Sequence, residues 1–321
     1  MNLPHTSYLF TSDKMSTKVA LIFPGQGAQS VGMGREFYES SQHAKAVFAA
    51  ADKIIPGLTD VIFSGPPEKL TSTKYCQPAI FTFSVAALKA LEAHPKFRNI
   101  TPSFACGLSL GEYSALTACG ALSFEETLKL VERRSFYMEE ATKLKKGAMA
   151  AVIGFNKDKL VELCRQTGAE VANFNSPDQI VITGEAEKVA KASEAIQAAG
   201  AKRVIVLDVS GAFHSSLMRP AVAKFEAELQ KCALKTPRFS ILSNVDAKPE
   251  TDPEKIRRNL ALQITSSVQW VDSVRSIAAA GVTTFLEIGP GTVLKGLIRK
   301  IDPALSVHNI RNPHDLESLP F

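Results

Sequence analysis

Short apolar runs and longer amphipathic stretches alternate along most of the chain. The short runs, which predict buried strands, cover residues 18–23, 101–106, 239–244 and 283–288. Apolar residues at helical spacing predict helices over residues 35–54, 76–93, 110–118, 124–142, 220–232, most of 253–280, and 292–300. Because strands that alternate with helices assemble into parallel sheets, this pattern predicts an α/β fold with a parallel-sheet core.

The middle of the chain follows a different pattern. It predicts strands over residues 147–154, 170–175, 179–184 and 203–209, and helices over 157–168 and 187–199. The order β-α-β-β-α-β is that of a ferredoxin-like unit. We therefore predict a small ferredoxin-like subdomain over residues 145–211. It would be inserted into a large α/β domain formed by residues 15–144 and 212–321, with residues 1–14 as a flexible extension.

Composition adds only mild constraints. Hydrophobic residues make up 45% and charged residues 21% of the 321, as in ordinary globular proteins. The net charge of +5 comes without a dense basic run, so it favours an anionic small ligand or an acidic protein partner over nucleic acid. Five cysteines without a CxxC pair argue against a metal site and favour reduced thiols in a cytoplasmic protein. No apolar run reaches the roughly 18 residues that span a membrane, and residues 1–14 lack the apolar core of a secretory signal.

A G-x-S-x-G pentapeptide, Gly107-Leu108-Ser109-Leu110-Gly111, lies between a predicted strand and a predicted helix. The glycines allow a sharp turn that exposes the Ser109 hydroxyl above the sheet edge. The backbone amide that follows the serine stands at a helix N-terminus, where it can bind an oxyanion. The alternative is a serine that only caps the helix. The placement between strand and helix favours the nucleophile.

A nucleophilic serine needs a base, and we favour His214 among the six histidines. It follows the predicted strand 203–209 and comes after the serine in the chain, the order found in α/β hydrolases. On position alone, capping of the next helix explains His214 equally well, but the other five histidines lie in less suitable places. No acidic residue has the signature of a third catalytic member, so a backbone carbonyl could orient the imidazole instead.

The predicted helix 124–142 carries a cation within its apolar stripe. One face of this helix combines five residues at helical spacing: Leu130, Val131, Arg134, Tyr137 and Met138. Arg133 lies beside this face and is expected to be exposed. A guanidinium in the stripe either pairs with a structural carboxylate or clamps a substrate carboxylate, and the pattern gives the two about equal weight. We include Arg134 and Met138 among the candidate substrate-binding residues.

Six segments, taken in order, resemble malonyl-CoA:acyl carrier protein transacylases, the acyltransferases of fatty acid and polyketide synthesis. They span roughly residues 18–300 and read Phe23–Gln29 (FPGQGAQ), Gly107–Tyr113 (GLSLGEY), Val131–Arg134 (VERR), Ala212–Ser215 (AFHS), Val268–Trp270 (VQW) and Glu287–Gly291 (EIGPG). The resemblance implies a hydrolase-like parallel-sheet core with an inserted ferredoxin-like subdomain. One position departs from the family pattern: Leu108 stands where the commonest motif has histidine before the serine. We expect the same reaction, because the base lies elsewhere.

The resemblance also implies roles for individual residues. Ser109 would be acylated, His214 would be the general base held by a backbone carbonyl, and Arg134 would bind the malonyl carboxylate. Three further residues complete the implied site: Gln26 and Leu110, whose backbone N–H groups would form the oxyanion hole, and Gln263, which matches a glutamine near the family's active site.

The implied reaction is a ping-pong transfer of a malonyl group from malonyl-CoA to the phosphopantetheine thiol of acyl carrier protein, for fatty acid synthesis. It needs no cofactor and no metal, because the CoA thioester is itself a substrate, and we expect a monomer. The alternatives are a thioesterase or esterase on a similar core, a polyketide-pathway acyltransferase, and a non-catalytic relative that binds the carrier protein. Arg134 and the inserted unit argue against the thioesterase. The complete set of Ser109, His214 and Arg134 argues against the non-catalytic relative.

Overall fold

The computed structural model describes residues 16–321, and the predicted extension 1–14 lies outside these residues. The larger of two sheets has six strands in the order β10-β9-β1-β2-β7-β8. Neighbouring strands are parallel except for the short β8, which pairs antiparallel to β7. The strands are β1 (Thr17–Phe23), β2 (Ile100–Gly107), β7 (Ser240–Leu242), β8 (Pro249–Glu250), β9 (Thr284–Ile288) and β10 (Ser306–Ile310). The predicted α/β fold with a parallel-sheet core is confirmed.

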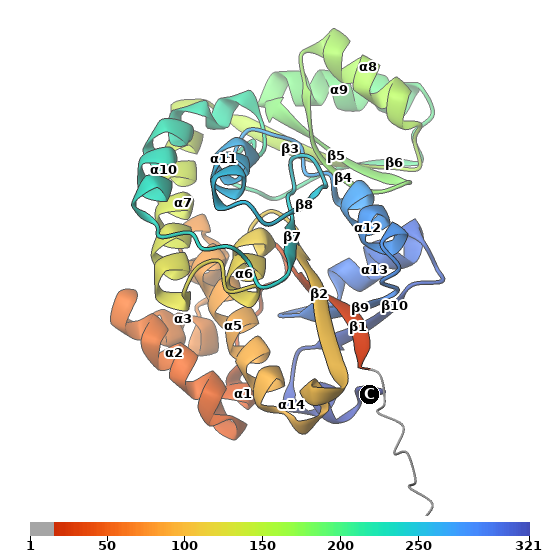
Figure 1. The fold of residues 1–321 in the computed structure, drawn as a ribbon. Coiled ribbons are helices and arrows are strands. Elements are labelled where there is room, and N and C mark those ends of the chain that lie inside the picture. The colour runs from red at the N-terminus through yellow and green to blue at the C-terminus, as the bar shows by residue number, and fades with distance from the viewer. Residues whose placement is uncertain (1–15) are drawn as a thin grey trace, which may run out of the picture.

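Helices cover both faces of this sheet, as Figure 1 shows. On β1, Leu21 and Phe23 belong to one apolar cluster and Ala20 and Ile22 to another, because successive side chains of a strand point to opposite faces. The first cluster includes residues of α1 (Arg35–Ser40), α2 (Gln42–Ile54), α3 (Leu58–Ser64), α4 (Pro67–Thr71), α5 (Thr73–Ala93), α6 (Gly111–Ala118), α7 (Phe124–Leu144), α10 (Arg219–Lys231), α11 (Pro253–Gln263) and α14 (Pro313–Glu317). The second includes α12 (Trp270–Ala279) and α13 (Val293–Ile301). A parallel strand buried on both faces explains the continuous apolar run at 19–23.

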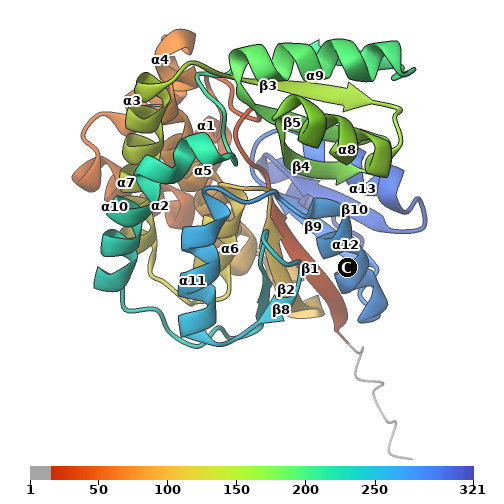
Figure 2. The same cartoon turned by 90° about the horizontal axis from the view of Figure 1, so that it is seen from above.

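The second sheet has four antiparallel strands in the order β4-β5-β3-β6. These are β3 (Gly147–Ile153), β4 (Glu170–Ser176), β5 (Gln179–Glu185) and β6 (Arg203–Val206). Helices α8 (Lys157–Thr167) and α9 (Ala186–Ala198) pack on one face, against Ala150 and Val152. The opposite face turns Met149 and Val181 toward the large core, so the small sheet lies over one end of the large one (Figure 2). The domain boundaries at residues 145 and 211 stay a prediction.

The free edge of β4 pairs through two backbone hydrogen bonds with Val268, which lies outside the strands of both sheets. The amide of Phe174 donates to the carbonyl of Val268 at 2.9 Å, and the amide of Val268 donates to the carbonyl of Ala172 at 2.8 Å. Val268 belongs to the segment 264–269 that links α11 to α12. This segment therefore pairs with the small sheet while it leads from one helix of the large core to the next.

Several predicted elements differ from the observed ones. The predicted strand 203–209 ends at Val206, because the amide of Leu207 makes the final bond to β3 and the chain then turns toward the pocket. The predicted helical stretch 253–280 is two helices, since residues 264–269 break it to pair with β4. Strand β10 and helices α3 and α4 were not predicted: the half-buried β10 has no continuous apolar run, and the two helices are short. In residues 16–321 no helix has the length and apolarity needed to cross a membrane.

Candidate active site

The site is built at the carboxyl ends of three neighbouring strands of the large sheet. Gln26 follows β1, Ser109 follows β2 and Asn244 follows β7. Because these strands are parallel, their carboxyl ends meet at one edge, which is where open α/β sheets place their ligands. The order of the strands thus brings together three segments that are far apart in the sequence.

Ser109 occupies a tight turn between β2 and α6. Its φ of 53° lies in the left-handed region, which non-glycine residues seldom adopt without a functional reason. The flanking glycines allow this turn: a Cβ on Gly107 would approach the backbone of Gly111 to 2.1 Å, and one on Gly111 would approach the carbonyl of Phe23 to 2.1 Å. The close approach of strand and helix lifts the serine side chain out of the core and into the pocket.

Asn244, which was not among the residues predicted from the sequence, holds this turn from both sides. Its Oδ1 accepts a hydrogen bond from the Ser109 amide at 2.6 Å, and its Nδ2 donates to the Gly107 carbonyl at 2.7 Å. The side chain is buried, so its amide satisfies backbone groups that water cannot reach. The signal in the sequence was a polar residue at the end of an apolar strand, which marks the ligand-binding edge of a parallel sheet.

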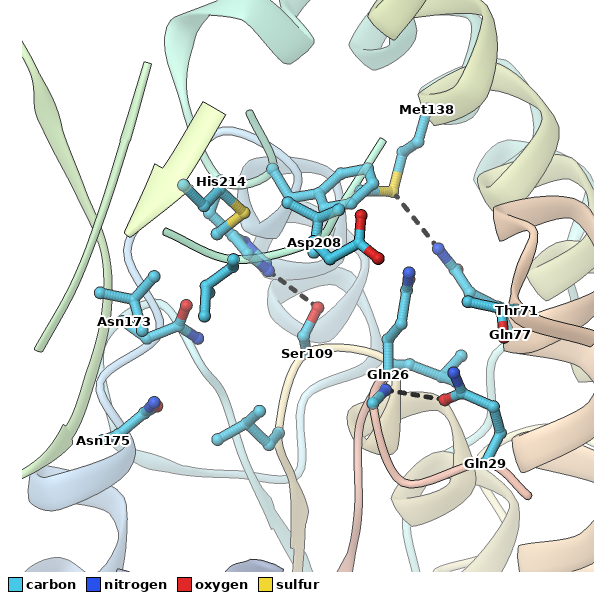
Figure 3. Close-up of a pocket in the computed structure, with 18 of the residues that line it drawn as sticks. Gln26, Gln29, Thr71, Gln77, Ser109, Met138, Asn173, Asn175, Asp208 and His214 are labelled. Carbon is cyan, nitrogen blue, oxygen red and sulfur yellow. Dashed lines mark hydrogen bonds between the residues drawn. The ribbon is translucent and has the colours of Figure 1, made fainter. Parts of the chain in front are cut away.

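His214 faces the serine, as the dashed line in Figure 3 shows. Its Nε2 lies 2.8 Å from the Ser109 Oγ. Its Nδ1 lies 2.9 Å from the carbonyl oxygen of Gln263 and 3.1 Å from that of Ser266. An Nδ1–H that donates to these carbonyls leaves Nε2 as the acceptor for the serine proton. Within the described part of the chain, carbonyls and not a carboxylate hold the imidazole, which is the arrangement that the missing acidic residue suggested.

Burial and the nearby Arg134 lower the pKa of the His214 imidazole to about 4. The ring is therefore neutral above that pH, and its Nε2 can accept a proton. We expect the rate at which an uncharged fluorophosphonate reagent modifies Ser109 to stay level from neutral pH down to about pH 5 and to fall near pH 4, where protonation removes the acceptor. Circular dichroism at each pH would check that the protein is folded. A fall centred near pH 6.5, the ordinary value for histidine, would contradict this prediction.

Arg134 is 1% exposed and reaches the serine from the opposite side. Its Nη1 donates to Oε1 of Gln77 at 2.6 Å, and its Nη2 donates to Oε1 of Gln263 at 2.9 Å and to the Ser109 Oγ at 3.1 Å. Its guanidinium carbon lies 5.2 Å from the ring centroid of Tyr113. No carboxylate of residues 16–321 forms a salt bridge with it. The alternative of a structural ion pair for Arg134 is thus not what the structure contains.

Two residues of this guanidinium network, Gln77 and Glu112, were assigned no role from the sequence, although Glu112 lies in the segment Gly107–Tyr113. Gln77 lies in α5, where it is an isolated polar residue in a helix buried along most of its length. Glu112 lies in the first turn of α6 and is 2% exposed, and its Oε2 accepts a hydrogen bond from Nε2 of Gln263 at 2.6 Å. In both cases the signal was an amide or carboxyl side chain within a stretch of mostly apolar or small residues.

The remaining predicted residues also lie at the site. Gln26, Leu110 and Met138 line the same pocket as Ser109. In the described chain, the backbone amides of Gln26 and Leu110 donate no hydrogen bond to another residue, so both donors are available for an oxyanion. Gln263 contacts the serine through its side chain, with Nε2 donating to the Ser109 carbonyl at 2.9 Å.

The pocket has walls from both sheets. Asn173 and Asn175 of β4 lie on the side of the small sheet, and Gln26 and Gln77 lie across from them (Figure 3). The polar residues Gln29, Thr71 and Asp208 also line the pocket. Apolar residues form most of the remaining wall: Leu108, Met138, Met149, Val181, Leu207, Val209 and Phe213. A serine with a neutral base, two free backbone donors and a buried cation can accept an acyl group that bears a negative charge.

A serine at the sharp strand–helix turn of an α/β sheet, paired with a histidine, defines the class of enzymes that pass an acyl group through a serine ester. The family model described as "Acyl transferase domain" matches residues 20–311. The chain belongs to the acyl transferase family and, within it, to the malonyl CoA-acyl carrier protein transacylases.

Individual relatives are similar over almost their whole length. The malonyl CoA-acyl carrier protein transacylase of Bacillus subtilis (strain 168) is 43% identical over 307 residues, which are 94% of this chain and 96% of the relative. A solved structure of the transacylase from Coxiella burnetii is 35% identical with a TM-score of 0.91, over 95% of this chain and 97% of the other. A malonyl-transacylase in complex with its type II PKS acyl-carrier protein is 37% identical with a TM-score of 0.90, over 94% and 98%.

Proposed function

We propose that the chain transfers a malonyl group from malonyl-CoA to the phosphopantetheine thiol of acyl carrier protein, through a malonyl ester of Ser109, and so supplies malonyl units for fatty acid synthesis. One observation carries the choice of acyl group: the buried Arg134 guanidinium faces Ser109 with only neutral oxygens as partners. A buried cation is costly without an opposite charge. A malonyl group brings a carboxylate at the end remote from its thioester and would supply that charge.

In the first half-reaction, His214 takes the Ser109 proton on Nε2 while Oγ attacks the thioester carbon. The amides of Gln26 and Leu110 bind the oxyanion of the tetrahedral intermediate. The intermediate collapses with cleavage of the carbon–sulfur bond, and the proton on His214 passes to the sulfur. CoA leaves as its thiol, and malonyl-Ser109 remains. The Arg134 guanidinium binds the malonyl carboxylate in both the substrate and the intermediates. This contact fixes the orientation of the thioester carbonyl relative to Ser109.

In the second half-reaction, the carrier thiol gives its proton to His214 and attacks the ester carbon. The Ser109 oxygen leaves and takes the proton back, so the enzyme returns to its starting state. This sequence needs no cofactor and no metal, because the thioester itself supplies the activated acyl group. Selectivity against acetyl-CoA follows, since an acetyl group would leave the guanidinium without a counter-charge.

The names of the relatives support both partners. The curated relatives are malonyl CoA-acyl carrier protein transacylases, and one solved relative holds its acyl-carrier protein. We propose that the chain likewise acts on malonyl-CoA and acyl carrier protein, as a monomer in the cytoplasm. A thioesterase would use the same serine ester but would pass the acyl group to water. A polyketide-pathway enzyme would carry out the same transfer to a different carrier.

The experiment that tests this function follows the acyl group by intact-mass analysis. The protein is incubated with malonyl-CoA, methylmalonyl-CoA or acetyl-CoA, and a holo carrier protein is then added. We expect a malonyl adduct on the enzyme that decays slowly in buffer and moves to the carrier when it is added. An adduct lost to water at the same rate with and without the carrier would identify a thioesterase. Equal labelling by acetyl-CoA would exclude the proposed selectivity.

A further inference from the structure

The side-chain amide of Gln263 lies between the buried guanidinium of Arg134 and the buried carboxyl group of Glu112. No step of the mechanism uses this carboxyl group. We propose that this group, Glu112, is a positioning residue for malonyl selectivity, because it fixes the Gln263 amide and thereby the direction in which Arg134 is held. The inference rests on the proposed function and concerns how its selectivity is built.

The Gln263 amide is fully engaged, which is the geometric basis of the proposal. Its Nε2 donates to Glu112 Oε2 at 2.6 Å and to the Ser109 carbonyl at 2.9 Å, and its Oε1 accepts from Arg134 Nη2 at 2.9 Å. Turning the amide over would set its N–H donors against the guanidinium donors and its oxygen against two acceptors. Glu112 makes the shortest of these three contacts, and Gln263 is fully buried, so water cannot replace it.

Glu112 is itself held in place. Its Oε2 also accepts a hydrogen bond from the backbone amide of Asn244 at 3.2 Å. Burial raises the pKa of the Glu112 carboxyl to about 7, against the opposing effects of Gln263, Asn244 and Arg134. A protonated carboxyl keeps one oxygen that accepts hydrogen bonds, so either form can orient the amide. The positioning role therefore depends on whether an acceptor oxygen of residue 112 reaches the Gln263 amide, and not on the charge of the carboxyl group.

Two conservative variants separate the effect of the position of the acceptor oxygen at residue 112 from the effect of its charge. Glu112→Gln keeps an oxygen acceptor at the same distance from the backbone but removes the charge. Glu112→Asp keeps the charge but withdraws the acceptor by one methylene group. A matched control is Glu287→Asp, because Glu287 is also a buried carboxylate that accepts from backbone amides, those of Leu294 and Lys295, but it does not line the pocket.

The measurement is the ratio of kcat/KM for malonyl-CoA to that for acetyl-CoA, with thermal unfolding of every variant. In Glu112→Asp we expect this ratio to fall about tenfold, mainly through a higher KM for malonyl-CoA, because a misdirected guanidinium weakens carboxylate binding. In Glu112→Gln and in Glu287→Asp we expect the ratio to stay within about threefold of the wild type.

Distinct results would overturn the inference. An unchanged ratio in Glu112→Asp, or an equal fall in Glu112→Gln, would show that acceptor reach does not set selectivity. If Glu112→Asp does not fold, Gln263→Met replaces it: removal of the amide must lower the ratio at least as much, and an unchanged ratio refutes the proposal. A wild-type protein without malonyl preference would instead overturn the proposed function, and the inference with it.

Discussion

Replacing Ser109 by alanine is expected to abolish the malonyl-enzyme adduct and to lower transfer to the carrier by roughly 10⁴-fold or more. The reason is covalent: the ping-pong route needs an oxygen on which the acyl group can rest, and alanine has none. The turn itself should persist, because Asn244 holds it through backbone groups that the substitution leaves in place. Intact-mass analysis after incubation with malonyl-CoA measures the adduct directly.

Ser114→Ala provides the matched control. Ser114 is a fully buried serine in α6, the helix that follows Ser109, and its hydroxyl has no hydrogen-bond partner in residues 16–321. This variant should form the adduct as the wild type does. A malonyl adduct that survives in Ser109→Ala would refute Ser109 as the nucleophile and would direct attention to another side chain of the pocket.

Arg134→Ala is expected to exchange the preferred acyl group. Loss of the guanidinium removes charge-assisted hydrogen bonds to the malonyl carboxylate that are worth about 3 kcal/mol. The value of kcat/KM for malonyl-CoA should therefore fall by on the order of 10²-fold. Acetyl-CoA makes no use of the guanidinium, and its relative rate should rise because the shortened side chain leaves no unpaired cation in the pocket. The two thioesters are compared by acylation rate under identical conditions.

Arg133→Ala is the control for this change, because Arg133 precedes Arg134 on α7 but is exposed. It should leave the malonyl preference unaltered. Unchanged preference in Arg134→Ala would remove the central support for malonyl as the substrate. Thermal unfolding accompanies both variants, since truncation of a buried side chain leaves a cavity that can destabilise the fold.

The principal side chains of the candidate site could be predicted from the sequence because local patterns mark them. Ser109 lies in a short motif between a strand and a helix, and Arg134 interrupts an apolar helix face. Both features are visible within a few residues. His214 was found by its place after the serine and by the poor placement of the other histidines. The alternation of apolar runs and helical stretches likewise predicted the parallel-sheet core.

The supporting network could not be predicted in the same way, because its members meet only through the tertiary fold. Gln77 lies 57 positions from Arg134, and Gln263 lies 129 positions from it. No local pattern shows that these amides converge on one guanidinium. The side chain of Asn244 reaches the nucleophile turn only because β7 pairs with β2. Which polar residues meet at a site is decided by strand order, and single-sequence periodicity carries little information about strand order.

The segment between α11 and α12 has a consequence for exchanging parts between relatives. The carbonyl of Gln263, the last residue of α11, and that of Ser266 within the segment hold the imidazole of His214, and Val268 hydrogen-bonds to the edge of β4. Grafting a foreign small sheet to broaden the range of accepted thioesters would therefore disturb the base as well as the pocket wall. A chimaera should carry residues 263–268 together with the grafted strands, so that the pairing partners and the imidazole anchor come from the same parent.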